Sequence, residues 1–443
     1  MTRRYFGTDG VRGRVGEHPM TVDFALNLAS AAARVLAPEG GTVLIGKDTR
    51  LSGYMIESAL EAGFVAAGVN AMLIGPLPTP GIAYMTTRFK ADFGVVISAS
   101  HNLYDDNGIK FFDATGAKLS DELEERIEKE LEGKPVTKTS RSLGRATRVD
   151  RSRTMYQEFC ISTLPAGIDL TGLKIVIDCA NGAAYKVGPR ILADLGAEIV
   201  PIGTSPNGRN INDGCGSLAP DLLQLTVPGV RANVGVALDG DGDRLVMVDH
   251  FGRIVDGDQL LYVIARALHE EGTLRGPVVG TVMSNFGLEL ALKKAGIEFM
   301  RAQVGDRYVL AMLREHGGVL GGESSGHILC LDKTTTGDGL VSALQVLAIM
   351  KKTGRSLAEL AAGMHKFPQV MINVKVAKRF DPKGMPTVQT AVARVEKRLG
   401  EEGRVVLRAS GTEPVIRVMV EGRDEGLTRE LATELADVVR AAV

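Results

Sequence analysis

The amino-acid sequence predicts an α/β protein made of three similar α/β domains with mixed sheets and a smaller C-terminal α+β domain. Short apolar runs rich in β-branched residues recur up to about residue 366, and each is followed by a polar or glycine-rich loop and a helical pattern. Beyond that point the pattern changes to three strands and two helices. The length of 443 residues suggests roughly three domains at about 150 residues each.

Strands are expected where the apolar runs are nearly continuous, because strands buried on both faces of a sheet show little alternation. In chain order the clearest are Thr42–Gly46, Phe93–Ser98, Lys174–Asp178, Asn233–Asp239, Val278–Val282 and Gly317–Gly322. The clearest helices are Asp121–Leu131, Gly188–Leu195, Leu340–Met350 and Leu427–Ala441. The last domain adds strands Val370–Val376, Arg404–Ala409 and Ile416–Glu421 and helix Thr387–Leu399.

Changes in composition divide the chain into four expected domains. Residues Gly133–Asp150 are basic and poor in apolar side chains, which is typical of a linker or surface loop. A weaker break lies near Asp249–Asp258, and the α/β pattern ends around Lys366–Gln369. The expected domains are therefore residues 1–150, 151–255, 256–366 and 367–443.

The composition excludes several classes of protein. Lys and Arg number 52 against 53 Asp and Glu, a net charge of −1, which argues against bulk attraction to nucleic acid or an anionic membrane. No apolar run approaches 18 residues, and Met1–Gly13 lacks the apolar stretch of a signal peptide. The four cysteines are scattered, without a C-x-x-C pair. We therefore expect a cytoplasmic enzyme with reduced thiols and with neither nucleic acid nor a membrane as partner.

Three aspartates alternate with glycine in DGDGDR, residues 239–244, directly after an apolar run. If this segment is a loop, Asp239, Asp241 and Asp243 converge, and each pair about 4–5 Å apart repels by roughly 3–4 kcal/mol at an effective dielectric of 20. A hard cation, Mg²⁺ or Ca²⁺, would relieve that repulsion. An EF-hand is disfavoured, because Arg244 and His250 stand where it needs glycine and glutamate. Mg²⁺ would leave room for a substrate phosphate; the alternative is a solvated acidic turn.

Polar residues follow the expected strand at Phe93–Ser98 in the segment SASHN. Ligands commonly bind where such strands end. In extended backbone the side chains of Ser100 and His101 would diverge, which makes them a poor nucleophile–base pair and disfavours a hydrolase of that kind. Ser100 can instead carry a phosphoryl group beside a metal. Lys110 either contacts phosphate or takes part in proton transfer, or it is an ordinary surface lysine. The alternative for the whole segment is a polar turn that caps the next element.

A third segment, GGESSGH at residues 321–327, has the chemistry of a sugar-binding loop. Glu323 can accept two hydrogen bonds and Ser325 can donate and accept, which suits vicinal hydroxyls. His327 is a candidate general acid or base. The alternative is a glycine-rich turn with a structural histidine.

A fourth segment, LRASGTEPVIRV at residues 407–418, lies between two strands of the last domain. Ser410, Gly411 and Thr412 offer N–H groups and hydroxyls to one phosphate, while Arg408 and Arg417 supply charge. A hairpin turn with two surface arginines is the alternative. Arg12, Lys47, Asp48 and Arg50 are weaker candidates, either phosphate contacts or members of salt-bridged loops.

Together these segments predict a phosphorylatable serine, a hard cation, a hydroxyl-binding loop and a second anion site. A phosphatase needs only the first two and a water molecule. The second anion site favours an enzyme that moves phosphate between two positions of one sugar.

The four segments, in this order and one per expected domain, resemble the α-D-phosphohexomutase superfamily over essentially the whole chain. The opening FGTDGVRG at Phe6–Gly13 and the Ser98–Asn102 segment are more similar to its glucosamine branch than to its phosphomannomutase/phosphoglucomutase branch. The resemblance implies domains around a central cleft and the interconversion of glucosamine 6-phosphate and glucosamine 1-phosphate, for UDP-N-acetylglucosamine and cell-wall synthesis in a bacterium. The other branch and a noncatalytic phosphosugar-binding protein are the alternatives.

The same resemblance implies roles for individual residues. Ser100 would be the phosphoserine, and its phosphate would complete the coordination of one Mg²⁺ per subunit by Asp239, Asp241 and Asp243. Arg244 would lie beside that phosphate, and Lys110 and His327 would assist proton transfer. The substrate-binding residues would be Arg12, His101, Glu323, Ser325, Arg408, Ser410, Gly411, Thr412 and Arg417. Glucosamine 1,6-bisphosphate would be the intermediate and activator, and a homodimer is suggested.

One position departs from the family pattern. Leu103 stands where proline is usual, and Asp105 adds a negative charge near the serine loop. Because proline restricts φ, Leu103→Pro should stabilise the loop if the backbone suits proline there.

Overall fold

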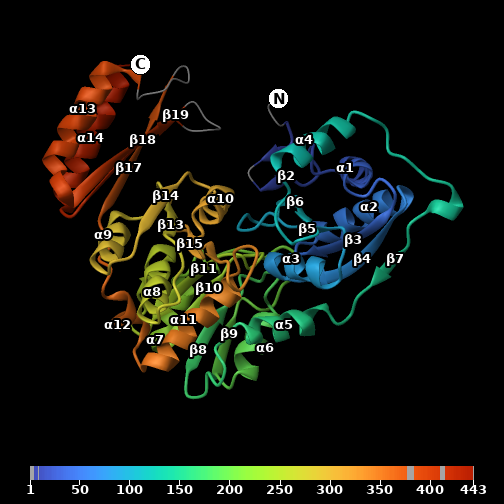
Figure 1. The fold of residues 1–443 in the computed structure, drawn as a ribbon, viewed down its shortest axis with the longest axis horizontal. Helices are drawn as coiled ribbons and strands as arrows, with labels where there is room; N and C mark the ends of the chain where they lie inside the picture. Colours follow the sequence, from blue (N-terminus) through green and yellow to red (C-terminus); the bar gives the residue numbers. More distant parts are fainter. Residues whose placement is uncertain (1–3, 8, 377–383, 410–414, 443) are drawn as a thin grey trace.

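The computed structural model describes residues 4–7, 9–376, 384–409 and 415–442, and it contains four successive sheets. Figure 1 shows the first sheet on one side of the molecule and the small C-terminal sheet, with its two helices, on the other. The second and third sheets lie between them and below. The predicted fold class, three α/β domains and a smaller C-terminal domain, is confirmed.

The first sheet has seven strands in the order β1-β2-β6-β5-β3-β4-β7. Its strands are β1 (Phe6–Gly7), β2 (Gly10–Arg14), β3 (Gly41–Lys47), β4 (Val69–Pro76), β5 (Phe93–Ile97), β6 (Asp106–Asp113) and β7 (Ala146–Arg148). Its helices are α1 (Val22–Leu36), α2 (Ser52–Ala66), α3 (Thr79–Arg88) and α4 (Asp121–Glu130). Val43 and Ile45 pack with α1 and α2, whereas Leu44 packs with α3, so β3 is buried on both faces as its continuous apolar sequence predicts.

The segment expected to be a linker contributes an edge strand to this sheet. Within Gly133–Asp150, β7 pairs in parallel with β4, and Ala146 stands opposite Ala71. A three-residue edge strand has little buried apolar surface, so its composition does not distinguish it from a loop.

The second and third sheets are mixed. The second, in the order β12-β11-β10-β8-β9, contains β8 (Lys174–Asp178), β9 (Glu198–Ile202), β10 (Val234–Leu238), β11 (Leu245–Asp249) and β12 (Ile254–Val255), with α5 (Ser152–Ser162), α6 (Val187–Asp194) and α7 (Asp221–Gly229). The third, in the order β14-β13-β15-β16, contains β13 (Val278–Thr281), β14 (Phe299–Ala302), β15 (Leu320–Gly322) and β16 (Ile328–Cys330). Its helices are α8 (Gly257–Glu270), α9 (Phe286–Lys294), α10 (Asp306–His316), α11 (Gly339–Thr353) and α12 (Leu357–Ala361).

The strand expected at Gly317–Gly322 is shorter than its sequence suggested. Gly317 ends α10 in the left-handed conformation, with φ of 66°, so the strand starts only at Leu320.

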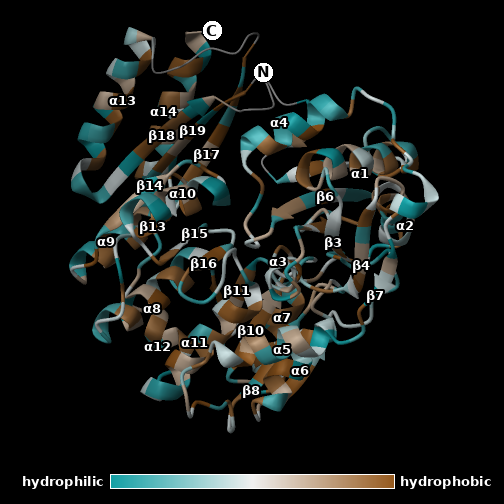
Figure 2. Cartoon of the chain, turned by 45° about the vertical axis from the view of Figure 1, so that its right-hand side comes forward, coloured by the Kyte–Doolittle hydropathy of each residue, from teal (hydrophilic) through white to brown (hydrophobic). Residues whose placement is uncertain are grey.

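The C-terminal domain is a three-stranded antiparallel sheet, β17-β19-β18, with two helices. These elements are β17 (Gln369–Lys375), β18 (Gly403–Ala409), β19 (Val415–Gly422), α13 (Pro386–Leu399) and α14 (Glu425–Ala441). Its apolar core is separate, while one continuous cluster joins the second and third domains to the α3 face of the first. Figure 2 shows apolar residues concentrated on the strands and on the inner faces of the helices. None of the described helices is long and apolar enough to cross a membrane.

Candidate active site

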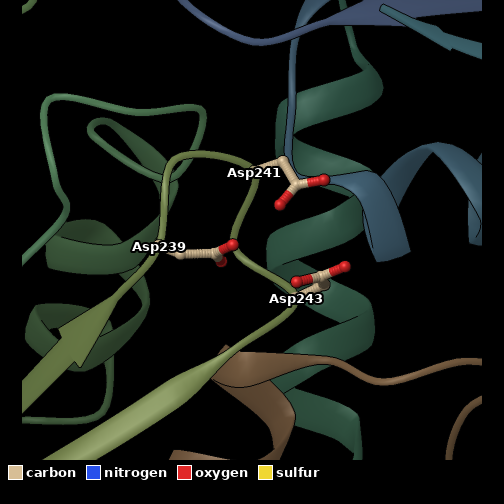
Figure 3. Close-up of side chains that lie close together, drawn as sticks. All are labelled: Asp239, Asp241 and Asp243. Atoms are coloured by element: carbon tan, nitrogen blue, oxygen red, sulfur yellow. The ribbon is translucent and has the colours of Figure 1, made fainter. Parts of the chain in front are cut away.

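Asp239, Asp241 and Asp243 lie in the tight loop that joins the antiparallel strands β10 and β11 (Figure 3). One carboxylate oxygen from each residue lies within 4.8 Å of the others, and all three side chains are buried. The predicted alternative of a solvated acidic turn is therefore wrong. Oδ1 of Asp241 and Oδ1 of Asp243 are buried without a hydrogen-bond partner among the described residues. Unpartnered buried carboxylate oxygens in this arrangement fit a hard divalent cation such as Mg²⁺.

The electrostatics of the loop are those of a cation site. Burial, followed by the nearby charges of Asp243 and Asp241, raises the pKa of Asp239 well above its usual range. Burial would also raise the pKa of Asp241, but the Lys110 ammonium outweighs it and holds that pKa well below its usual range. Burial and the neighbouring carboxylates therefore disfavour the ionised form of Asp239, and a bound cation would offset both effects.

Ser100 faces this loop from the end of β5. Its Oγ donates a hydrogen bond of 2.6 Å to Oδ2 of Asp239, and the residue is buried. The expected divergence of Ser100 and His101 is wrong, because Ser100 has φ of +52° rather than an extended backbone. Oγ of Ser100 consequently lies 3.4 Å from Nδ1 of His101. Burial, with smaller effects from Arg244 and Arg12, lowers the pKa of His101 to about 4, so this imidazole is neutral at pH 7.

Two residues support the strained serine turn from behind. The fully buried Arg50 donates to the carbonyl oxygens of Ser100 and Asn102 and forms an ion pair with Asp48. Nδ2 of Asn212 donates to the same two carbonyl oxygens at 2.9 Å. From the sequence Arg50 is only one of the weaker candidates, and nothing in the sequence around Asn212 indicates its role, because that role depends on a contact between two domains.

Lys110 and His327 each form an ion pair with one aspartate of the loop. Nζ of Lys110 lies 2.8 Å from Oδ2 of Asp241. Nδ1 of His327 lies 3.6 Å from Oδ2 of Asp243. Burial would lower the pKa of His327, but Asp243 and then Asp306 outweigh it and raise that pKa to about 9. Both residues thus act on the aspartate loop.

A cavity of about 940 Å³ opens above Ser100, and residues of all four domains line it. The predicted residues that line it are Arg12, Ser100, His101, Asp243, Arg244, Glu323, Ser325, His327, Arg408 and Arg417. Asp239, Asp241 and Lys110 are buried behind this surface. Ser410, Gly411 and Thr412 lie outside the described residues. The volume is in the range of small-molecule sites.

The far wall of the cavity is basic. Arg408 on β18 and Arg417 on β19 stand directly opposite each other in the antiparallel ladder. Burial, with a contribution from Arg417, lowers the pKa of Arg408. No carboxylate ion pair to either arginine is recorded for the described part of the chain, so this pair of like charges favours an anion. On the third domain, Glu323 accepts a hydrogen bond of 3.1 Å from the Gly305 amide and so presents its carboxylate at the cavity.

Models of the phosphoglucomutase/phosphomannomutase family match nearly the whole chain. They cover α/β/α domain I at residues 3–136, α/β/α domain II at 155–252, α/β/α domain III at 256–367 and the C-terminal domain at 371–438. A solved family member from Burkholderia thailandensis superposes with a TM-score of 0.82 at 24% identity, over 98% of this chain and 97% of that one. An N-acetylphosphoglucosamine mutase from Aspergillus fumigatus gives a TM-score of 0.68 at 19% identity, over 100% and 96%. These two likenesses show the fold.

Sequence relatives place the chain more narrowly. A phosphoglucosamine mutase of Methylococcus capsulatus is 58% identical over 445 residues, covering 100% of this chain and 99% of that protein. The phosphoglucosamine mutase of Aeromonas hydrophila is 57% identical over 443 residues, covering 100% of both. The chain belongs to the phosphoglucosamine mutase family, one branch of the four-domain phosphohexomutases.

Proposed function

We propose that this protein interconverts glucosamine 6-phosphate and glucosamine 1-phosphate through a phosphoserine at Ser100 and a bisphosphorylated sugar. The observation that carries the proposal is the layout of the cavity. Ser100 is hydrogen-bonded to the aspartate loop at one wall, while Arg408 and Arg417 form a second anion site at another. Membership of the phosphoglucosamine mutase family supports the choice of substrate.

The first half-reaction transfers the phosphoryl group of phosphorylated Ser100 to the free hydroxyl of the bound sugar phosphate. The bond from phosphorus to Oγ breaks and a bond from phosphorus to the sugar oxygen forms, while the proton of the sugar hydroxyl ends on Oγ, which becomes a hydroxyl again. The second half-reaction runs the same step in reverse on the reoriented bisphosphate, so Ser100 regains a phosphoryl group. The sugar then leaves with its phosphate at the other position.

The residues around Ser100 supply charge and position for this transfer. One Mg²⁺ per subunit, held by Asp239, Asp241 and Asp243 with an oxygen of the serine phosphate, would neutralise charge on the phosphoryl group. Arg244, which lines the cavity beside Ser100, adds a guanidinium on the side of the sugar. His101 is neutral and lies 3.4 Å from Oγ, and His327 carries a proton; both can take part in proton movement.

The sugar is held between the third and fourth domains. Glu323 and Ser325 would bind its hydroxyls, and Arg408 and Arg417 would bind the phosphate that is not transferred. Ser410, Gly411 and Thr412 complete that phosphate site in our proposal, and Arg12 lines the cavity near the N-terminus. A phosphatase would have no use for this second site.

The proposal is tested by ³¹P NMR of the purified protein with Mg²⁺ and a trace of glucosamine 1,6-bisphosphate, with glucosamine 6-phosphate or glucose 6-phosphate as substrate. We expect rapid conversion of glucosamine 6-phosphate to glucosamine 1-phosphate and much slower conversion of glucose 6-phosphate. Equal or faster conversion of glucose would assign the protein to the phosphomannomutase/phosphoglucomutase branch. Release of inorganic phosphate alone would support a phosphatase.

Ser100→Ala separates the catalytic proposal from a phosphosugar-binding protein. We expect it to abolish turnover while the protein stays folded by circular dichroism, and intact mass to show loss of one phosphoryl group. Undiminished turnover in this variant would refute the role of Ser100. Light scattering tests the homodimer that the resemblance suggests, and calorimetric stoichiometry tests one Mg²⁺ per subunit.

A further inference from the structure

Lys118 joins the first domain to the third beside the cavity. It follows β6, where it forms an isolated bridge with Phe112. Its Nζ lies 2.5 Å from Oδ1 of Asp9 and 2.6 Å from Oδ2 of Asp306, the first residue of α10. One ammonium therefore pairs with two carboxylates that come from different domains, one from the turn between β1 and β2 and one from the start of α10.

Each of these two carboxylates also contacts a second cationic side chain, which in turn pairs with an aspartate of the loop. Oδ2 of Asp9 lies 2.9 Å from Nζ of Lys110, which contacts Asp241. Oδ2 of Asp306 lies 3.5 Å from Nε2 of His327, which contacts Asp243. The side chains thus alternate in charge from Asp241 to Asp243, and Lys118 is the middle member of the series.

This series is largely removed from solvent. The side chains of Lys118, Asp9 and Asp306 are 18%, 20% and 16% exposed, and those of Lys110 and His327 are 3% and 6% exposed. Charges screened so little by water influence one another more strongly than pairs on the surface do. A change at Lys118 should consequently reach the aspartate loop from both ends of the series.

We propose that Lys118 is a positioning residue that sets how firmly Lys110 and His327 hold Asp241 and Asp243, and so limits the affinity of the loop for a divalent cation. With Lys118 removed, Asp9 and Asp306 lose a shared partner and draw Lys110 and His327 away from the loop. The site also loses one nearby positive charge. Both effects favour a dication, whereas the misplaced Lys110 and His327 slow phosphoryl transfer.

The test measures Mg²⁺ binding by isothermal titration calorimetry on the full-length protein without sugar, together with kcat and KM. For Lys118→Met we expect a three- to tenfold lower Kd for Mg²⁺, a ten- to hundredfold lower kcat and a KM within threefold of the unaltered protein. Lys118→Arg keeps the charge, and its Kd for Mg²⁺ should lie within twofold of that of the unaltered protein. General damage to the fold would instead raise the Kd for Mg²⁺, which is opposite to the expected change.

Arg307→Met is the matched control. Arg307 also joins α10 to the first domain, through Asp121 and Glu124, but its guanidinium has no recorded contact with Asp9 or Asp306 among the described residues. Its Kd for Mg²⁺ should stay within twofold of the unaltered protein. An equal shift in Arg307→Met, or an unchanged Kd in Lys118→Met, would overturn the inference.

Asp306→Asn provides a second variant if Lys118→Met does not fold. It removes a negative charge and the partner that draws His327 from Asp243, so we expect a higher Kd for Mg²⁺; a lower one contradicts the proposal. The activity measurements rest on the proposed function, but the Mg²⁺ titrations do not. If the unaltered protein converts no sugar phosphate, the proposed function fails while the titrations still decide the role of Lys118.

Discussion

The two ends of the cavity are built differently. Around Ser100 and the aspartate loop, buried side chains from three domains converge, and those domains share one continuous apolar cluster. Arg408 and Arg417 lie at the other end, on a sheet with its own core. We infer that the end where phosphate is transferred is preorganised, whereas the end that grips the other phosphate is carried on a more independent unit.

A polar joint connects that unit to the third domain. Arg404 on β18 forms an ion pair with Glu421 on β19 and donates to the carbonyl oxygens of Val282 and Ser284 at 3.0 and 2.6 Å. Arg404 and Glu421 are opposite each other in the same ladder as Arg408 and Arg417, four residues away, which is roughly 13 Å along a strand. A small rotation at this contact therefore displaces Arg408 and Arg417. Such movement suits a binding site that must accept the phosphate at either end of a sugar.

Asp241→Ala should have the largest effect, because it removes a ligand from the preorganised end and leaves Lys110 without its main partner. Loss of metal-assisted charge stabilisation of about 4 kcal/mol lowers kcat by on the order of 10³-fold. Stopped enzyme assays at saturating substrate measure this. The exposed Asp437→Ala serves as control and should leave kcat unchanged. Residual activity above a tenth of the unaltered protein would show that the loop contributes little.

Arg404→Met should weaken the joint. It leaves Glu421, whose side chain is fully buried, without its cation, a change that typically costs roughly 3–5 kcal/mol. We expect calorimetry to show a separate, earlier transition for the C-terminal domain, and hydrogen exchange to increase in β18 and β19. Arg398→Met, on the exposed face of α13, is the control. If the whole protein instead melts as one unit at a lower temperature, the proposed independence of this domain is wrong.

His327 allows a pH test of the preorganised end in the metal-free protein. Its pKa is raised from 6.5 to about 9, so the ion pairs with Asp243 and Asp306 contribute roughly 3 kcal/mol. This stabilisation is complete below pH 6.5 and is lost as the pH rises through 9. Relative to His327→Gln, the unaltered protein should be more stable at pH 6 than at pH 9.5 by urea unfolding. A difference that does not change with pH would contradict the charged state.

Arg417→Gln should have a moderate effect. Losing one charge-assisted hydrogen-bonding group to a phosphate costs about 2 kcal/mol, or roughly 30-fold in kcat/KM. Because this phosphate is held before and during transfer, the change should appear mainly in KM, unlike the effect of Asp241→Ala on kcat. Steady-state kinetics distinguish the two, with the exposed Arg429→Gln as control. A change confined to kcat would place Arg417 at the transfer end.

The sequence predicted the parts of the site that are local in the chain. The three aspartates alternate within one short loop, and Ser100 follows a strand whose apolar run is unmistakable, so both can be identified from the order of residues alone. Lys118, Asp306 and Asn212 stand alone in their segments, and only contacts between domains give them a role. The left-handed backbone at Ser100 was also not predicted, because no glycine stands there to indicate it. Hydrogen bonds from Arg50 and Asn212 to the Ser100 carbonyl oxygen support this conformation instead.

Leu103→Pro should have the smallest effect and tests the serine loop at its exposed edge. Leu103 is 51% exposed, and no hydrogen bond from its amide is recorded in the described structure. Its carbonyl accepts from the Asp106 amide at 3.2 Å, which proline leaves intact. Restricting φ in the unfolded chain should therefore stabilise the protein by about 0.4–1 kcal/mol, without loss of kcat. Thermal unfolding and limited proteolysis measure this, with the exposed Leu143→Pro as a comparison outside the loop. Greater cleavage near residue 103 would show that the backbone there does not suit proline, and that the anchoring of Asn102 by Arg50 and Asn212 requires the freedom that leucine leaves.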